Sequence, residues 1–288
     1  MLTIACNEKP SDNSIQKVIK PHYTEFINPY DSVGIKHNIL LSDIMSYLDL
    51  NPQLLTSVQA PSLSFDSLIA SLVCNAYINT NINSNCTINN SLTAYYFYDT
   101  QSLSNTPDTI NIGSIFNSTI ESILLIATTR DYNYCQRIYH AIEFCSDENN
   151  YPNNQAAFLA LNDSLTSISN SMGLESWISN EYFSLEMLSV AIHSCQFWQN
   201  YFLIHSMYKQ KHPVVQEKAT ARQVAIVAAD CVGALHGAYK GAIISSGTAI
   251  GTLVGAVGGG IIGAISYSAG MAGLFEIWDA WKAVVASM

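Results

Sequence analysis

Glycine recurs at every fourth residue towards the C-terminus, and this spacing constrains the fold more than any other feature of the chain. It holds in two series, which are Gly233, Gly237 and Gly241, and then Gly247, Gly251, Gly255, Gly259 and Gly263. Positions four apart lie nearly above one another on an α-helix, so each series forms a stripe. A glycine inside a helix costs about 1 kcal/mol relative to alanine. Close approach of a second helix is the usual compensation, and we therefore predict that these glycines are helix-packing residues.

The two glycine series are out of phase with each other. The residue four beyond Gly241 is Ser245, whereas the second series begins at Gly247. This slip predicts a break at residues 245–248, and hence two helices folded into a hairpin. The three consecutive glycines at 258–260 are the competing place for the break, because glycine weakens a helix interior.

The remainder of the chain also has helical periodicity, and no long segment alternates between apolar and polar residues. We therefore predict an all-α fold, in which a helical bundle is followed by the glycine-rich hairpin and by a short amphipathic helix. The expected bundle helices cover residues 31–48, 64–77, 114–128, 132–144, 156–168 and 183–209. Asp31 is the expected N-cap of the first helix, which continues despite Gly34. Residues 93–98 fit a short strand or a helical turn equally well.

Pro213 is the expected boundary between the bundle and the glycine-rich segment, because proline is not tolerated inside a helix. The chain then divides into a tether at 1–27, an α-helical domain at 28–212 and the hairpin with its C-terminal helix at 213–288. That last helix carries Trp278 and Trp281 beside an apolar segment. Tryptophan in this position suits a membrane interface and the edge of a protein core equally well.

The charge of the chain argues against nucleic acid as a partner. Its 288 residues carry a net charge of −10, and only 12 of them are Lys or Arg. Nucleic-acid binding requires clustered cations that neutralise phosphates, and the sequence has no such cluster. The hydrophobic fraction of 49% is enough to fill a sizeable core.

The seven cysteines include no C-x-x-C pair, so a structural zinc site is not expected. Cys135 and Cys145 are predicted on one helix, where ten residues rise about 15 Å, too far for a disulfide. We therefore expect buried free thiols. Cys74 and Cys86 are the best candidate disulfide if the compartment is oxidising.

The first residues contain the sequence Ile4-Ala5-Cys6, followed by a polar stretch at 7–14. This resembles the end of a bacterial lipobox, in which a small residue precedes a lipidated cysteine. Thr3 stands where leucine is usual, and the charged and apolar regions of a signal peptide are missing. The chain therefore either begins inside a signal peptide or matches by chance. The first alternative predicts lipidation of Cys6 and a lipid-anchored place in the bacterial cell envelope, and the second predicts a cytoplasmic protein.

Two further resemblances concern the start of the bundle and the glycine-rich segment. Residues 28–38, Asn-Pro-Tyr-Asp-Ser-Val-Gly-Ile-Lys-His-Asn, resemble the opening of uncharacterised lipoprotein-like proteins from Bacteroidota-type bacteria. Those proteins similarly carry a glycine-rich apolar C-terminal segment. The eight stripe glycines resemble the glycine zippers of two-peptide bacteriocins, which are small and cationic, unlike this acidic chain. These resemblances imply membrane association and carry no established activity.

No residue pattern predicts catalysis, a cofactor or a metal. The sequence has no HExxH, GxSxG or P-loop motif. His193 and Cys195 are two apart and point to different faces of a helix, so we expect structural histidines. Glu143 and Asp147 are expected on a solvated helix end. Asp230 interrupts an otherwise apolar helix, and we interpret it as the point where that helix reaches solvent, an intramembrane charge being the alternative.

The sequence thus predicts a protein that is not an enzyme. The leading hypothesis is a membrane-associated cell-envelope protein whose glycine-zipper hairpin packs closely or inserts into the membrane, with self-association as a further expectation. Each arm has about the ~20 residues that a bilayer requires. The alternative hypothesis is an envelope binding or structural module in which the hairpin is buried against the α-bundle.

Overall fold

The structure is a computed structural model, and it describes residues 26–51, 112–147, 149–151, 153–178, 181–209, 220–244, 256–265 and 267. The described part is 83% helical, with seven helices and no strand, which confirms the predicted all-α fold. The labelled helices are α1 (Asp31–Leu50), α5 (Ile112–Ile123), α6 (Thr129–Ser146), α7 (Asn154–Met172), α8 (Phe183–Lys209) and α9 (Thr220–Ile244). Residues 256–265 form a further helix.

The helices begin where side chains satisfy their first backbone N–H groups. The Thr128 side chain accepts from the N–H of Asp131 at the start of α6, and the Asn153 side chain accepts from the N–H of Ala156 at the start of α7. Asp31 is not an N-cap as the sequence predicted, because it is already the first residue of α1. Tyr30 precedes it and makes no side-chain cap, while the backbone N–H of Asp31 bonds to Asn28 O.

Helix α5 ends at Ile123, whereas the sequence predicted a helix as far as residue 128. The N–H groups of Ile126 and Ala127 both bond to Ile123 O, which turns the chain out of the helix. Thr128 must also be extended in order to cap α6, so the two helices cannot be continuous. By contrast, α8 has the predicted bounds of 183–209.

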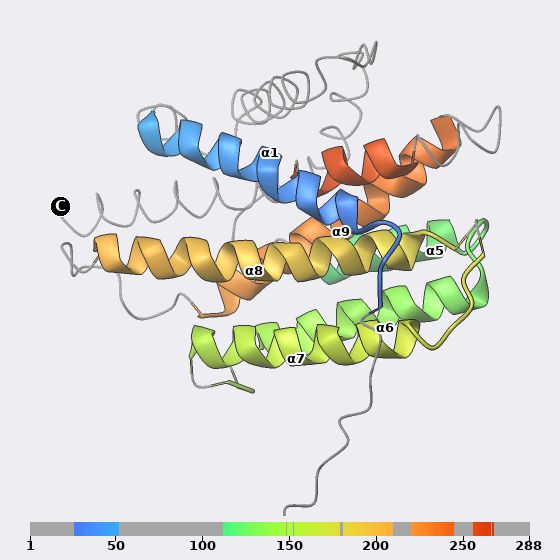
Figure 1. The fold of residues 1–288 in the computed structure, drawn as a ribbon, viewed down its shortest axis with the longest axis horizontal. Coiled ribbons are helices and arrows are strands. Elements are labelled where there is room, and N and C mark those ends of the chain that lie inside the picture. Colours follow the sequence, from blue (N-terminus) through green and yellow to red (C-terminus); the bar gives the residue numbers. More distant parts are fainter. Residues whose placement is uncertain are drawn as a thin grey trace, which may run out of the picture.

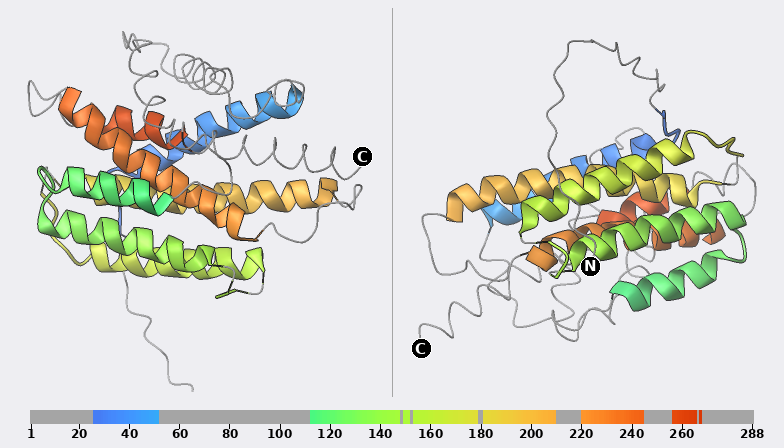
Figure 2. Two further views of the ribbon diagram at one scale, coloured as in Figure 1. Left: turned by 180° about the vertical axis from the view of Figure 1, so that it is seen from behind. Right: turned by 90° about the horizontal axis from the view of Figure 1, so that it is seen from below.

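The core lies between α8 and α9, with the other helices packed around this pair. Helix α1 packs on α8, α5 packs on α9, and α6 contacts α7, α8 and α9 (Figures 1 and 2). Trp198 of α8 is the largest fully buried side chain. One hydrophobic core contains residues from every described helix, so α9 and residues 256–265 belong to the same core as the bundle.

The helix at 256–265 runs without interruption through Gly258 and its two following glycines, so the competing hairpin break at 258–260 is wrong. The other predicted break, at 245–248, lies outside the described residues. So do the predicted helix at 64–77, the segment at 93–98 and the C-terminal amphipathic helix.

Candidate functional site

Asp230 of α9 is the centre of a buried polar cluster between α1, α8 and α9. Its side chain is fully buried, so the interpretation that it marks where the helix reaches solvent is wrong. Oδ2 accepts a hydrogen bond from Trp198 Nε1 at 2.9 Å and another from Ser194 Oγ, both on α8. Oδ1 lies 3.7 Å from Nε2 of His37, which is also fully buried. The two hydrogen bonds satisfy Oδ2 inside the core, whereas Asp230 Oδ1 and His37 Nε2 have no hydrogen-bond partner among the described residues.

His37 connects Asp230 to the surface through a chain of polar contacts. His37 Nδ1 lies 3.0 Å from Asn38 Oδ1, and Asn38 Nδ2 donates to the backbone O of His193 at 2.7 Å. His193 Nε2 lies 2.8 Å from Oδ1 of Asp31, whose side chain is half exposed. The route passes from His37 and Asn38 of α1 to His193 of α8 and back to Asp31 of α1, and thus links the two helices from the core to the solvent.

Gly34 allows α1 and α8 to approach closely beside the same cluster. Its N–H donates to Ser189 Oγ at 2.9 Å, and Ser189 Oγ donates to Asp31 O at 3.0 Å. A Cβ added at Gly34 would lie 2.7 Å from Ser189 Oγ, so any larger residue would push the helices apart. In the sequence, Gly34 only interrupts the periodicity of the first predicted helix, and nothing there indicates this close contact.

The hydrogen bonds of the Asp230 cluster join α8 to α9. Ser194 donates to the carboxylate rather than to a histidine, so the hydroxyl is not paired with a general base. Asp230, His37, Ser194 and Trp198 are all fully buried. Among the described residues, no group of three or more His, Cys, Asp or Glu side chains is placed to hold a metal ion.

Glu186 of α8 is a second buried carboxyl group, and no motif in the sequence marks it as a candidate site residue. It is 1% exposed, and among the described residues neither of its side-chain oxygens has a hydrogen-bond partner. Burial raises the pKa of Glu186 well above its ordinary value, and the nearby Asp131 raises this pKa further. A Cβ added at Gly260 would lie 2.9 Å from Glu186 Oε2, so the 256–265 helix lies directly on this carboxyl.

We expect Glu186→Gln to reduce the pH dependence of stability. Because the folded-state pKa is raised, the neutral carboxyl contributes stability that is fully present below the unfolded pKa, near 4.5. That contribution is lost as the pH rises through the raised folded-state pKa. Wild-type protein should therefore lose unfolding free energy with rising pH above about 4.5, and the glutamine variant should lose less. Urea unfolding across this pH range measures the difference. The exposed Glu143→Gln is the control, and identical slopes for wild type and Glu186→Gln would refute the expectation.

Asp131 of α6 caps a different helix from its own. Its carboxylate accepts from the N–H of Ser184 at 2.7 Å and from the N–H of Phe183 at 3.2 Å, at the start of α8. An anion is favourable at a helix N-terminus, where free N–H groups and the helix dipole both attract it. Burial nevertheless raises the pKa of Asp131, and the hydrogen bonds at α8 only partly oppose that effect.

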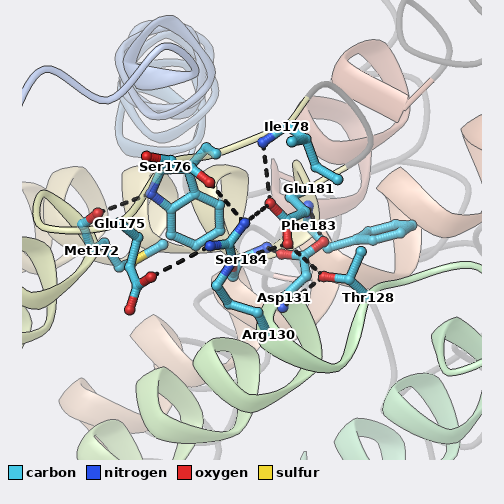
Figure 3. A network of polar contacts seen from close by, with 11 residues as sticks. Thr128, Arg130, Asp131, Met172, Glu175, Ser176, Ile178, Glu181, Phe183 and Ser184 are labelled. Atoms are coloured by element: carbon cyan, nitrogen blue, oxygen red, sulfur yellow. Dashed lines mark hydrogen bonds and ion pairs between the residues drawn. The ribbon is translucent and has the colours of Figure 1, made fainter.

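Arg130 joins the start of α6 to the segment that leads into α8 (Figure 3). Its Nε donates to Glu181 Oε1 at 2.9 Å, and Nη2 donates both to Glu181 Oε2 and to Ser176 O. The guanidinium also lies 5.1 Å from the ring centroid of Trp177, a cation–π distance. Burial opposes ionisation of Glu181, but its hydrogen bonds from Arg130 and Thr128 prevail, and its pKa is lowered.

The structure describes five of the eight predicted packing glycines. Gly233 and Gly237 of α9 lie against Gly263 and Gly259 of the 256–265 helix. A Cβ added at Gly237 would lie 2.7 Å from the backbone carbon of Gly259, and one at Gly263 would lie 2.9 Å from the Cα of Gly237. Gly241 is buried in α9. The remaining predicted packing residues, Gly247, Gly251 and Gly255, lie outside the described residues, as do Cys6, Cys74 and Cys86.

The four described cysteines are Cys135, Cys145, Cys195 and Cys231, and all are free, buried thiols. Burial raises the pKa of each thiol, to about 12 for Cys195 and well above the ordinary value for Cys135 and Cys231. Cys135 and Cys145 share α6, as the sequence predicted.

Within the described residues, no helix has the combination of length and hydrophobicity that crossing a membrane requires. Comparison of the whole chain with models of protein families, with curated proteins and with solved structures found no match.

Proposed function

We propose that this chain is a non-catalytic helical module, held at a bacterial cell-envelope membrane by lipidation of Cys6, whose glycine-rich segment packs inside its own bundle. The observation that carries the proposal is the contact of Gly233 and Gly237 with Gly263 and Gly259. The glycine stripe lets two helices of the same molecule approach closely. The packing gained by this approach offsets the low helix propensity of glycine.

The burial of α9 supports an internal role for this segment. Val224, Val227, Val232 and Leu235 are all at most 1% exposed, so the apolar surface of α9 already has protein partners. Moving α9 into a bilayer would expose the faces of α5, α6 and α8 that it now covers. It would also carry the Asp230 side chain away from Trp198 and Ser194, which now bond to its carboxylate.

The geometry of the polar cluster supports the non-catalytic part of the proposal. The carboxylate of Asp230 is fully buried and is engaged by structural partners on two helices. A substrate would have to separate α1, α8 and α9 in order to reach it. The same contacts can hold the three helices in their relative positions without any such separation.

Metabolic labelling tests the membrane attachment. We expect a palmitate analogue to label the wild-type protein in a lipoprotein-processing bacterial host, expressed from the full reading frame, and not to label Cys6→Ser. The lipid group would be attached to the sulfur atom of Cys6. Cys135→Ser, which removes a buried thiol instead, is the matched control and should keep the label. Equal labelling of wild type and Cys6→Ser, or labelling of neither, would reject the lipidation.

Membrane insertion of the hairpin is the second candidate function, and the composition of residues 241–275 favours it, because this stretch contains no Asp, Glu, Lys or Arg. The two candidates predict opposite effects of loosening the glycine contact. If the segment inserts, Gly237→Leu should release it and increase dye leakage from phospholipid vesicles. If the segment is an internal packing element, the variant should lose stability without causing leakage.

A further inference from the structure

The 256–265 helix lies beside α9 and also meets α8, where it covers the Glu186 carboxyl (Figures 1 and 2). The contact is made at Gly260. A Cβ added there would lie 2.9 Å from Glu186 Oε2, 3.5 Å from Ala234 O and 3.7 Å from Ala238 Cβ. Glu186 is therefore enclosed at the place where three helices meet, and the lack of a side chain at Gly260 leaves the room for its carboxyl.

Among the described residues, nothing neutralises Glu186 if its carboxyl ionises. Neither oxygen accepts a hydrogen bond, and no ion pair includes this side chain. The 256–265 helix contains no ionisable residue, and α7 contains only the exposed Asp163. The basic side chains of the neighbouring helices lie against other acids: Arg130 against Glu181, His37 against Asp230 and His193 against Asp31.

The ionisable groups that interact electrostatically with Glu186 are acids. They are Asp131 and Cys135 on α6, and Tyr30 and Tyr182 just before α1 and α8. Burial raises the pKa of Tyr182 to about 12, and it also raises the pKa of Tyr30 and of the Cys135 thiol. These three groups are therefore neutral between about pH 5 and pH 8, and the carboxylate of Asp131 would repel a second negative charge.

Helix α9 also offers Glu186 no cation. On the face that carries Ala234, its ionisable groups are Asp230 and Cys231. The Asp230 carboxylate already accepts from Ser194 and Trp198, and burial raises the pKa of the Cys231 thiol well above its ordinary value. An ionised Glu186 would thus be an unpaired charge inside the core, which is far more costly than a neutral carboxyl there.

We propose that the proton on the Glu186 carboxyl holds the 256–265 helix against the bundle, and that this helix opens locally when rising pH transfers the proton to solvent. Opening would let water reach the carboxylate. The 256–265 helix is the element that moves, because α9 is bonded to α8 through Asp230 and also packs on α5, α6 and α7. The inference rests on the internal packing of the glycine-rich segment in the proposed function, and adds its regulation.

The direction of the pH effect follows from the burial of the carboxyl. Burial, and then Asp131, raise the pKa of Glu186 in the closed state well above its ordinary value of 4.5, which the open state regains. The closed state is therefore fully favoured below about pH 4.5, and this advantage is lost as the pH rises through the raised pKa. Over that interval the opening constant should increase by up to about tenfold per pH unit.

Hydrogen–deuterium exchange of the full-length chain detects this opening even in a minority state, which matters because Ile261 and Ile265 are buried. Wild type is compared with Glu186→Gln at each pH, so the intrinsic pH dependence of amide exchange cancels. We expect the ratio of wild-type to variant exchange rates in residues 256–265 to rise about tenfold or more between pH 5 and pH 8. The amides of α7 should stay better protected than this segment at every pH.

Two further variants make the measurement specific to ionisation of the buried carboxyl. Glu186→Met cannot ionise and has a similar volume, so it should behave like Glu186→Gln. Glu143→Gln removes an exposed carboxyl and should behave like wild type. Wild-type protection factors at 256–265, corrected for the intrinsic rate at each pH, must fall with pH on their own, so the test does not depend on the folding of either Glu186 variant.

A ratio that stays constant with pH, while residues 256–265 remain protected, would overturn the proton-dependent opening and leave the proposed internal packing intact. Equal protection of this segment and of α7 in wild type would also overturn it, because the two would then open only in global unfolding. Exchange of 256–265 as fast as in an unfolded chain, at every pH and in every variant, would reject the internal packing itself together with this inference.

Discussion

Gly237→Leu should lower the free energy of unfolding by about 2 kcal/mol or more. A Cβ at this position would lie 2.7 Å from the Gly259 backbone carbon and 3.1 Å from the Gly263 Cα. The obstacles are backbone atoms of a second helix, so they cannot rotate aside as a flexible side chain can. Overpacking of this kind costs about 1–3 kcal/mol and occasionally more. The gain in helix propensity on replacing glycine, up to about 1 kcal/mol, opposes this loss.

Chemical denaturation of the full chain measures the effect, and the sign of the change decides its interpretation. Gly258→Leu is the matched control, because Gly258 lies in the 256–265 helix but is partly exposed. A side chain at this partly exposed position can extend into solvent, so the propensity gain should dominate and the control should be as stable as wild type or more stable. If Gly237→Leu is also as stable as wild type, the close helix approach does not exist in solution.

Asp230→Ala should be comparably or more destabilising, by about 2–5 kcal/mol, because it leaves two buried hydrogen-bond donors without their acceptor. Trp198 Nε1 and Ser194 Oγ would both lose their acceptor inside the core. His37 Nε2 would lose the carboxylate that lies 3.7 Å away. An unmade buried hydrogen bond is costly, since the released group finds no water there.

The exposed carboxylate of Asp163 on α7 provides the control for the loss of a negative charge. Asp163→Ala should remain within about 0.5 kcal/mol of wild type, as is usual for exposed positions. Thermal and urea unfolding of both variants give the comparison. A loss for Asp230→Ala no larger than that for Asp163→Ala would mean that the buried cluster contributes nothing to stability.

Much of the fold could be predicted from periodicity, because helices bury one face. The bounds of α8 follow from its apolar residues alone, and the predicted helix at 132–144 lies within α6. Helix ends that are determined by a neighbouring helix were harder to predict from the sequence. Helix α5 ends early because Thr128 is needed as the cap of α6, and its own apolar pattern contains no sign of this competition.

The candidate site was less predictable, because its members are brought together only by tertiary packing. His37 lies on α1 and Asp230 on α9, far apart in the sequence, and Ser194 and Trp198 reach the carboxylate from α8. A carboxylate in an apolar helix is compatible with a solvent-exposed position and with a buried partner, and periodicity alone does not distinguish the two. The burial of Glu186 was unpredictable for a different reason. Its neighbours predict a helix with a broad apolar face, and nothing local shows that the 256–265 helix lies on its carboxyl.

Alkylation of the four described buried thiols would report which helices separate from the core when the protein unfolds locally. A thiolate is the reactive species towards alkylating reagents, and burial suppresses it at Cys135, Cys195 and Cys231. These thiols lie on α6, α8 and α9, so each reports separation of a different helix from the shared core. Reaction at Cys231 without reaction at Cys135 would reveal a partial unfolding in which α9 leaves while α6 stays in place. The order of modification would then be the order in which the bundle comes apart.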